Sequence, residues 1–192
     1  MSETTVPQEA EVAVDLKDPA LAAFLAWLLP GLGHFYQGRT AKAVLFFVCI
    51  LGTFLFGLYL GSSETAGWGR VVYASWRPDD KRLPYLCQVG VGLPALPALV
   101  QTLRVRNGRA PLPPKQFMAP PPLQPGAGAP TLNQLHRQLG RYFELGTVYT
   151  MVAGLLNVLA IYDAWGGPVV AHRQEDEEGE QKKEQDKDEH DG

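Results

Sequence analysis

The chain has 192 residues, of which 46% are hydrophobic and 19% are charged, and its formal net charge is −3 at pH 7. The segment from Arg173 to Gly192 alone contains ten acidic and four basic residues, so the net charge indicates no particular binding partner. The two cysteines, Cys49 and Cys87, lie far apart in the sequence and exclude a disulfide framework or a CxxC pair.

The charged residues are unevenly spread. Four largely apolar stretches contain none, and each is close to the ~20 residues that a helix needs to cross ~30 Å of hydrocarbon. These stretches are residues 19–38, 43–63, 83–103 and 145–162. We therefore predict an all-α integral membrane protein, with three or four transmembrane or membrane-embedded helices, disordered termini and a proline-rich loop.

Residues 1–17 are predicted to be a disordered N-terminus, and residues 18–63 a transmembrane helical hairpin. The first 18 residues are acidic, unlike the basic start of a secretory signal. Asp18 and Pro19 are typical of a helix start. A helix that ended at Pro30 would rise only ~17 Å, too little to cross, so we expect the helix to continue with a kink at Pro30.

The middle of the chain mixes aromatic, basic and proline-rich segments. Residues 64–82 interleave tryptophan and tyrosine with arginine and lysine, which is typical of a loop at the membrane interface and also occurs in nucleic-acid binding. Residues 83–103 form a third, proline-broken membrane segment, which is expected to be a kinked span, a re-entrant segment or a surface helix. Residues 104–130 read as a proline-rich linker without a core.

An amphipathic helix and a last span complete the predicted elements. Residues 131–143 begin with the capping box of Thr131 and Gln134 and suit a helix lying in the interface. Residues 144–167 are predicted to be the last transmembrane helix, followed by a disordered acidic tail over 168–192. Asn157 and Asp163 are polar within this span, so both are functional candidates. The alternatives are helix-to-helix hydrogen bonding for Asn157 and interfacial solvation for Asp163.

The sequence WLLPGLGHFYQGRTAKAVLFF resembles the hairpin of the TM-two domain family, in which a glycine-rich helix end leads into a Phe-Tyr-x-Gly turn and a second, basic-capped helix. NVLAIYDAW at Asn157–Trp165 is similar to the aliphatic run closing on aspartate that ends the family's second helix. The resemblance implies a bacterial integral membrane protein of a domain-of-unknown-function family. The hairpin-turn residues are Pro30, Gly31, Gly33, His34, Phe35, Tyr36, Gly38 and Arg39.

Two departures from that family are visible. Gly33 and His34 stand where many members carry an acid or histidine followed by arginine, so the acidic–basic pair linked to signalling is absent. Residues 62–144 are an insertion without a counterpart in a two-helix member. In the turn itself we expect Arg39 and Lys42 to face lipid phosphates.

The sequence contains few residue patterns that are typical of catalytic sites. The histidines lie in no metal-ligand spacing, and neither a nucleophile elbow nor a phosphate-binding loop occurs. We predict no catalytic residue, cofactor or metal. The expected role is that of a non-enzymatic structural or interaction component of the membrane; the alternative is a small channel or carrier subunit with a polar pathway around Asn157 and Asp163.

Partners and topology follow from the same pattern. The expected partners are the lipid bilayer and a second copy or another membrane protein, with no nucleic acid and no small-molecule ligand. The expected location is a membrane, as a multi-pass protein of the bacterial inner membrane. The basic residues favour three spans and the charge-free lengths favour four, and we expect four embedded segments with the third one broken or re-entrant.

Overall fold

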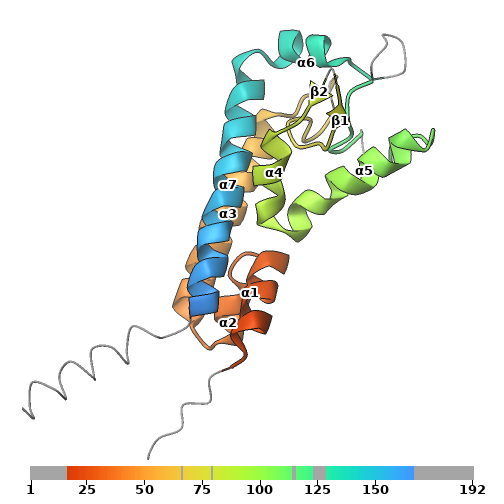
Figure 1. Ribbon diagram of the computed structural model, residues 1–192. Helices are drawn as coiled ribbons and strands as arrows, with labels where there is room; N and C mark the ends of the chain where they lie inside the picture. The colour runs from red at the N-terminus through yellow and green to blue at the C-terminus, as the bar shows by residue number, and fades with distance from the viewer. Residues whose placement is uncertain (1–16, 66, 79, 114–115, 123–128, 167–192) are drawn as a thin grey trace, which may run out of the picture.

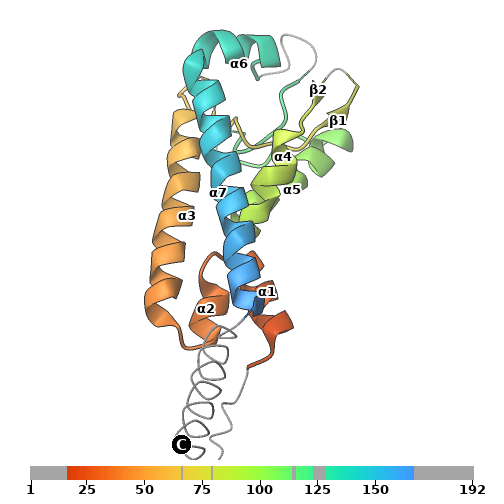
Figure 2. The same cartoon turned by 60° about the vertical axis from the view of Figure 1, so that its left-hand side comes forward.

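The fold was analysed in a computed structural model that describes residues 17–65, 67–78, 80–113, 116–122 and 129–166. The predicted disordered ends, 1–17 and 168–192, lie outside the described residues except for Lys17. The described chain is mainly helical (Figures 1 and 2). Its elements are α1 (Pro19–Leu28), α2 (Leu32–Tyr36), α3 (Thr40–Leu60), β1 (Trp76–Arg77), β2 (Asp80–Lys81), α4 (Pro84–Gln88), the 3-10 turns η1 (Val89–Val91) and η2 (Leu93–Ala95), α5 (Leu96–Arg106), α6 (Leu132–Leu139) and α7 (Arg141–Gly166).

Two long antiparallel helices, α3 and α7, form the axis of the molecule (Figure 2). They touch at glycines: a Cβ added at Gly57 would lie 2.7 Å from Thr150 Cγ2 and 2.9 Å from the carbonyl oxygen of Gly146. A Cβ added at Gly146 would likewise lie 2.7 Å from the carbonyl oxygen of Gly57, so small residues allow the two helices to approach closely. The buried face of α7 is composed largely of small residues, namely Gly146, Thr147, Thr150, Ala153, Gly154, Asn157, Ala160 and Ala164, beside Phe143.

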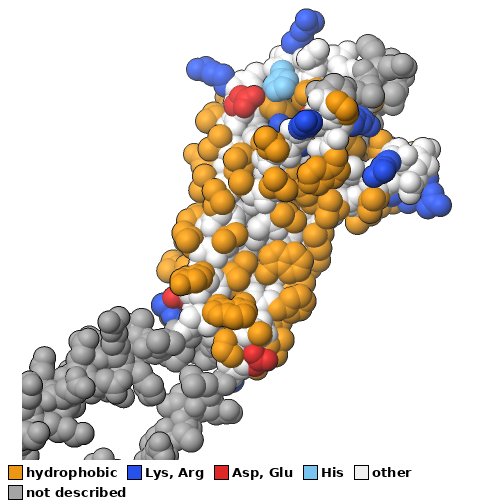
Figure 3. Space-filling model, in the orientation of Figure 1, with side chains coloured by type: hydrophobic (Ala, Val, Ile, Leu, Met, Phe, Trp, Pro, Cys, Tyr) orange, Lys and Arg blue, Asp and Glu red, His pale blue; other side chains and the backbone are white. Residues whose placement is uncertain are grey.

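The outward faces of α3 and α7 carry large apolar side chains. Leu159 on α7 is 66% exposed and Val44 on α3 is 62% exposed. Figure 3 shows hydrophobic side chains over the long flank of the molecule, with lysine and arginine gathered at its two ends. This is the reverse of a soluble helix, which buries its large apolar residues and exposes small or polar ones. Both helices are long and apolar enough to cross a membrane.

The predicted kinked helix through Pro30 is wrong. Helix α1 ends at Leu28, and Pro30 lies in a turn that leads back down through α2. Leu29 is extended, as the residue before a proline prefers, and Gly31 adopts a φ of 83° that completes the reversal. Lys17 Nζ donates to the carbonyl oxygen of Tyr36, so α1 begins where α2 ends. Residues 17–38 thus form a short helical hairpin.

The segment 83–103 is likewise broken and turns back on itself. Helix α4 leads into η1, the chain reverses at Gly92 with a φ of 87°, and α5 returns. The two ends of the segment are hydrogen-bonded to adjacent residues of the preceding loop. The backbone N–H of Arg82 donates to Ser75 O (3.1 Å), and Thr102 Oγ1 donates to Ala74 O (2.7 Å). The segment is therefore broken at its prolines and glycines, and its position relative to a membrane stays a prediction.

The described residues within 61–82 and 107–140 pack together as a cap over one end of the long helices (Figure 1). The proline-rich linker was expected to lack a core, yet its Met118 is fully buried, and so is Tyr73 of the predicted interfacial loop. Arg70 is also fully buried and donates from Nη1 to Ala119 O (2.7 Å), and burial lowers its pKa to about 10. The proline-rich residues 116–122 are therefore part of a folded layer.

Helix α6 carries the predicted capping contact, since the backbone N–H of Thr131 donates to Gln134 Oε1 (2.9 Å). The helix ends earlier than predicted, at Leu139. Gly140 has a φ of 52° and separates α6 from α7, which begins at Arg141. Leu135 and Leu139 are buried in the main hydrophobic core, so the apolar side of α6 packs against the rest of the cap.

Candidate functional site

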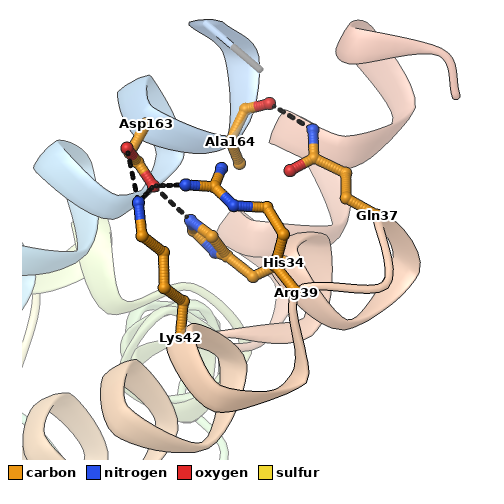
Figure 4. Close-up of polar contacts among 6 residues, drawn as sticks. All are labelled: His34, Gln37, Arg39, Lys42, Asp163 and Ala164. Atoms are coloured by element: carbon orange, nitrogen blue, oxygen red, sulfur yellow. Dashed lines mark hydrogen bonds and ion pairs between the residues drawn. The ribbon is translucent and has the colours of Figure 1, made fainter. Parts of the chain in front are cut away.

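Asp163, in the last turns of α7, is surrounded by three basic groups, one from α2, one from the turn that follows it and one from the first turn of α3 (Figure 4). His34 Nε2 lies 2.8 Å from Asp163 Oδ2, Arg39 Nη2 lies 3.2 Å from it, and Lys42 Nζ lies 3.4 Å from it. Gln37 adds a neighbouring contact, because its Nε2 donates to the carbonyl oxygen of Ala164 (2.7 Å). We call these groups the Asp163 cluster.

The local sequence explains why the turn reaches α7. Gly33 packs so closely on α1 that an added Cβ would overlap the carbonyl oxygen of Ala22, and one at Gly31 would overlap that of Ala43 on α3. These contacts hold α2 against both helices, with His34 directed at α7. Gly38, with a φ of 81°, then turns the chain so that Arg39 precedes α3 on the same side as Asp163.

His34 is the buried member of the cluster. Its side chain is 0% exposed, its ring lies 4.8 Å from that of Phe46, and its Nδ1 has no hydrogen-bond partner among the described residues. Burial lowers its pKa, outweighing the hydrogen bond with Asp163, which raises it. Arg39 and Lys42 already compensate the carboxylate. We therefore assign a neutral ring that donates from Nε2 to Asp163.

This assignment predicts a pH dependence of stability. A histidine with a lowered folded pKa contributes its full stability above the unfolded value of 6.5, and this contribution declines as the pH falls below 6.5, because the unfolded chain takes up the proton more readily. We expect the thermal unfolding midpoint of the detergent-solubilised chain to fall more between pH 7.5 and 5.5 for the wild type than for His34→Gln. Parallel pH profiles would contradict a neutral buried His34.

Asn157 lies in the middle of α7 and is 0% exposed. Its Nδ2 donates to the carbonyl oxygens of Ala26 on α1 (3.1 Å) and Gly90 in η1 (2.9 Å). The tips of the two broken segments also touch, because an added Cβ at Gly92 would overlap the carbonyl oxygen of Trp27. Asn157 thus connects both broken segments to α7, which is the hydrogen-bonding alternative that the sequence left open.

The structure separates the two polar candidates of α7. Asn157 and Asp163 are six residues apart, about 9 Å along the helix axis, and contact different groups. Of the hairpin-turn residues, His34 and Arg39 join Asp163, and Gly31 and Gly33 pack on helices. Phe35 is 62% exposed and lines, with Pro30 and Gly31, an apolar depression of about 220 Å³.

Two expectations about this turn need correction. Asp163 is not merely solvated, and Arg39 and Lys42 pair with it, although they were expected to face lipid phosphates. The role of Gln37 was missed altogether. The partners are separated by more than 120 residues, and a single sequence contains no signal that pairs them. No group of three or more metal-ligating His, Cys, Asp or Glu side chains occurs among the residues described.

The comparison with protein families covers all of these elements. A family model described as a family of unknown function, DUF6677, matches residues 21–177. The chain belongs to the DUF6677 family. Membership in a family of unknown function is thus confirmed, and the match shows no TM-two motif. The DUF6677 region includes both the Asp163 cluster and the contacts of Asn157 with Ala26 and Gly90, which we call the Asn157 junction. No curated protein and no solved structure gives a significant match.

Proposed function

We propose that this DUF6677 protein is an integral membrane protein in which α3 and α7 cross the bilayer and the two re-entrant segments enter it from opposite sides. The observation that carries this is the exposure of the long apolar helices: of the most apolar 18 residues, only 28% are buried in α3 and 39% in α7. A core helix of a soluble protein of this length would be mostly buried. The outward residues of α7 include Leu155, Leu156, Val158 and Leu159.

The broken segments fit the same environment. Non-helical backbone at membrane depth is tolerated only where protein surrounds it, because lipid offers no hydrogen bonds. The carbonyl groups freed at the end of α1 and in η1 receive the Asn157 amide. Small residues on α7 allow both segments to approach closely. The polar groups inside the helical part therefore serve to join its elements.

We infer a non-enzymatic, structural or interaction role, in which the membrane part anchors the folded cap on one side of the bilayer. The use of His34, Asn157 and Asp163 in contacts between elements supports this role. The alternative, a channel or carrier, draws on the free Oδ1 of Asn157 and Oε1 of Gln88, which are buried and lack partners among the described residues. Gly92 and Gly154 pack directly against backbone carbonyls of the neighbouring segments, with no room for even a Cβ. This close packing around Asn157 favours the structural role.

The topology provides the test. In a chain with Cys49 and Cys87 replaced, single cysteines at Thr40, Glu64 or Asn107 are labelled with an impermeant maleimide in sealed vesicles. We expect Glu64→Cys and Asn107→Cys to react from one side and Thr40→Cys from the other. Glu64 precedes the second re-entrant segment and Asn107 follows it, so labelling of these two from opposite sides would mean that residues 83–103 cross the bilayer.

A membrane-fractionation control accompanies this labelling. The full chain is expected to remain with membranes after alkaline carbonate extraction, because two spans are removed only by detergent. Release into the aqueous fraction would overturn the proposal of a membrane protein, whatever the labelling pattern.

A further inference from the structure

A pocket between the cap and α5, lined by both polar and apolar side chains, is used by none of the roles above. It lies between β1 and α5, has a volume of about 300 Å³, and is lined in part by Ser75, Trp76, Arg77, Thr102 and Arg106. It is separate from the Asp163 cluster, which is at the opposite end of α3 and α7 (Figure 1). This volume is at the lower end of the range of small-ligand sites, about 300–1,000 Å³.

The pocket presents uncompensated hydrogen-bond donors. Ser75 is only 4% exposed, and its Oγ has no partner among the described residues. Neither Arg77 nor Arg106 forms an ion pair with a carboxylate within the described ranges. Arg77 donates from Nη1 to Pro121 O (3.3 Å), which leaves its other N–H groups available. The nearest acid in register, Asp80, accepts instead from the hydroxyl of Tyr73 (3.2 Å).

The walls of this pocket are fixed by the fold. Thr102 Oγ1 donates to Ala74 O (2.7 Å) and to Ala98 O (2.8 Å), which ties α5 to the residues preceding β1. Ser75 O accepts from the backbone N–H of Arg82 (3.1 Å). The backbone segments that carry Ser75 and Arg106 are therefore held on both sides of the pocket before any ligand binds, which lowers the cost of forming the site.

Two guanidinium groups and a buried hydroxyl suit an anion with several oxygen atoms. Guanidinium forks match phosphate and carboxylate, and a tetrahedral phosphate can accept from two arginines and a hydroxyl together. The rim is partly apolar, with Trp76 63% exposed, and α5 also exposes Leu103 (57%). An apolar rim suits a ligand that joins an anionic group to a less polar part.

We propose that the pocket of Ser75, Arg77 and Arg106 binds the phosphate group of a phosphoester. Two sources offer this chemistry: an anionic phospholipid headgroup, whose chains would lie along α5, and a soluble phosphoester. The cap sits at the end of the two candidate spans, where headgroups would lie. The proposal concerns the cap, so it extends beyond the anchoring role inferred for the membrane part.

The experiment uses the full chain in a mild non-ionic detergent and measures binding by native mass spectrometry and by titration calorimetry. The probes are phosphatidylglycerol in mixed micelles, glycerol 3-phosphate in solution, and phosphatidylcholine as the zwitterionic lipid. The variants are Arg77→Gln/Arg106→Gln and Ser75→Ala. The matched control is Arg137→Gln, an exposed arginine on α6 that is not among the residues lining the pocket.

We expect saturable binding of one phosphoester to the wild type, at least tenfold weaker binding to the double variant, weaker binding to Ser75→Ala, and no change for Arg137→Gln. Preference for phosphatidylglycerol assigns the lipid source, and binding of glycerol 3-phosphate assigns the soluble one. Absence of saturable binding of any probe overturns the proposal, and so does an equal loss with Arg137→Gln, which indicates non-specific charge attraction. The thermal unfolding midpoint of each variant shows that it is folded.

Discussion

Replacing Gly154 with alanine is expected to produce a large loss of stability, although the change adds only one methyl group. An added Cβ at this position of α7 would overlap the carbonyl oxygen of Cys87 and lie 2.8 Å from its carbonyl carbon. The obstacle is backbone, which cannot rotate away as a side chain can. Overpacking of this kind costs about 1–3 kcal/mol. A loss of 3 kcal/mol would lower Tm by roughly 6–12 °C for a chain of this size.

The matched control for Gly154→Ala is Gly52→Ala. Gly52 is also inside a long helix, α3, but is exposed and has no atom within 4 Å of an added Cβ. Alanine there is expected to leave Tm unchanged or to raise it slightly, because alanine is the better helix former. Thermal unfolding of both variants in the same detergent compares the two sites. Equal Tm values for Gly154→Ala and Gly52→Ala would mean that α4 does not pack on α7.

Asn157→Ala is expected to destabilise the protein by a different route. The substitution removes both hydrogen bonds that hold Ala26 O and Gly90 O, and it leaves these carbonyls unpartnered. Hydrogen bonds between membrane helices contribute about 0.6–1.7 kcal/mol each, so the two together give a loss on the order of 2 kcal/mol. Leu156→Ala, which truncates an exposed neighbour on α7, is the control and is expected to have a smaller effect.

The Asn157 variant also separates the two proposed roles. In the structural role, Asn157→Ala lowers Tm and makes α1 and α4 more accessible to an impermeant probe, with no flux through either protein in liposomes. In a carrier role, the wild type supports a measurable flux that Asn157→Ala abolishes. Wild-type flux lost at unchanged Tm would contradict the structural role.

The sequence was informative where the cause of structure is local. The runs free of charge at 43–63 and 145–162 correspond to α3 and α7, the two candidate spans, because length and apolarity are properties of the run itself. The Thr131–Gln134 contact is equally local. The glycine–aromatic pattern predicted a family of unknown function with a TM-two hairpin; the DUF6677 match confirms the first part and shows no TM-two motif.

Tertiary contacts decided what the sequence could not. Whether a helix kinks or turns back at Pro30 depends on the carbonyl of Ala43, against which Gly31 packs, and on the Asn157 amide that receives the end of α1. The burial of Arg70 depends on Ala119, which was assigned to a linker. Asp163 was predicted as a functional candidate, but its basic partners, Arg39 among them, lie more than 120 residues earlier in the chain. Their charge alone did not indicate whether they face lipid or protein.

The Asn157 junction also bears on the order in which the protein is made. The hydrogen bond between Asn157 and Ala26 joins residues 131 positions apart, and the one between His34 and Asp163 joins residues 129 apart. A ribosome releases α1 and α2 long before it reaches α7. Until then the carbonyl oxygen of Ala26 and Nε2 of His34 lack the hydrogen-bond partners that α7 provides. The N-terminal hairpin therefore reaches its final structure only when the last helix has been synthesised and inserted beside it.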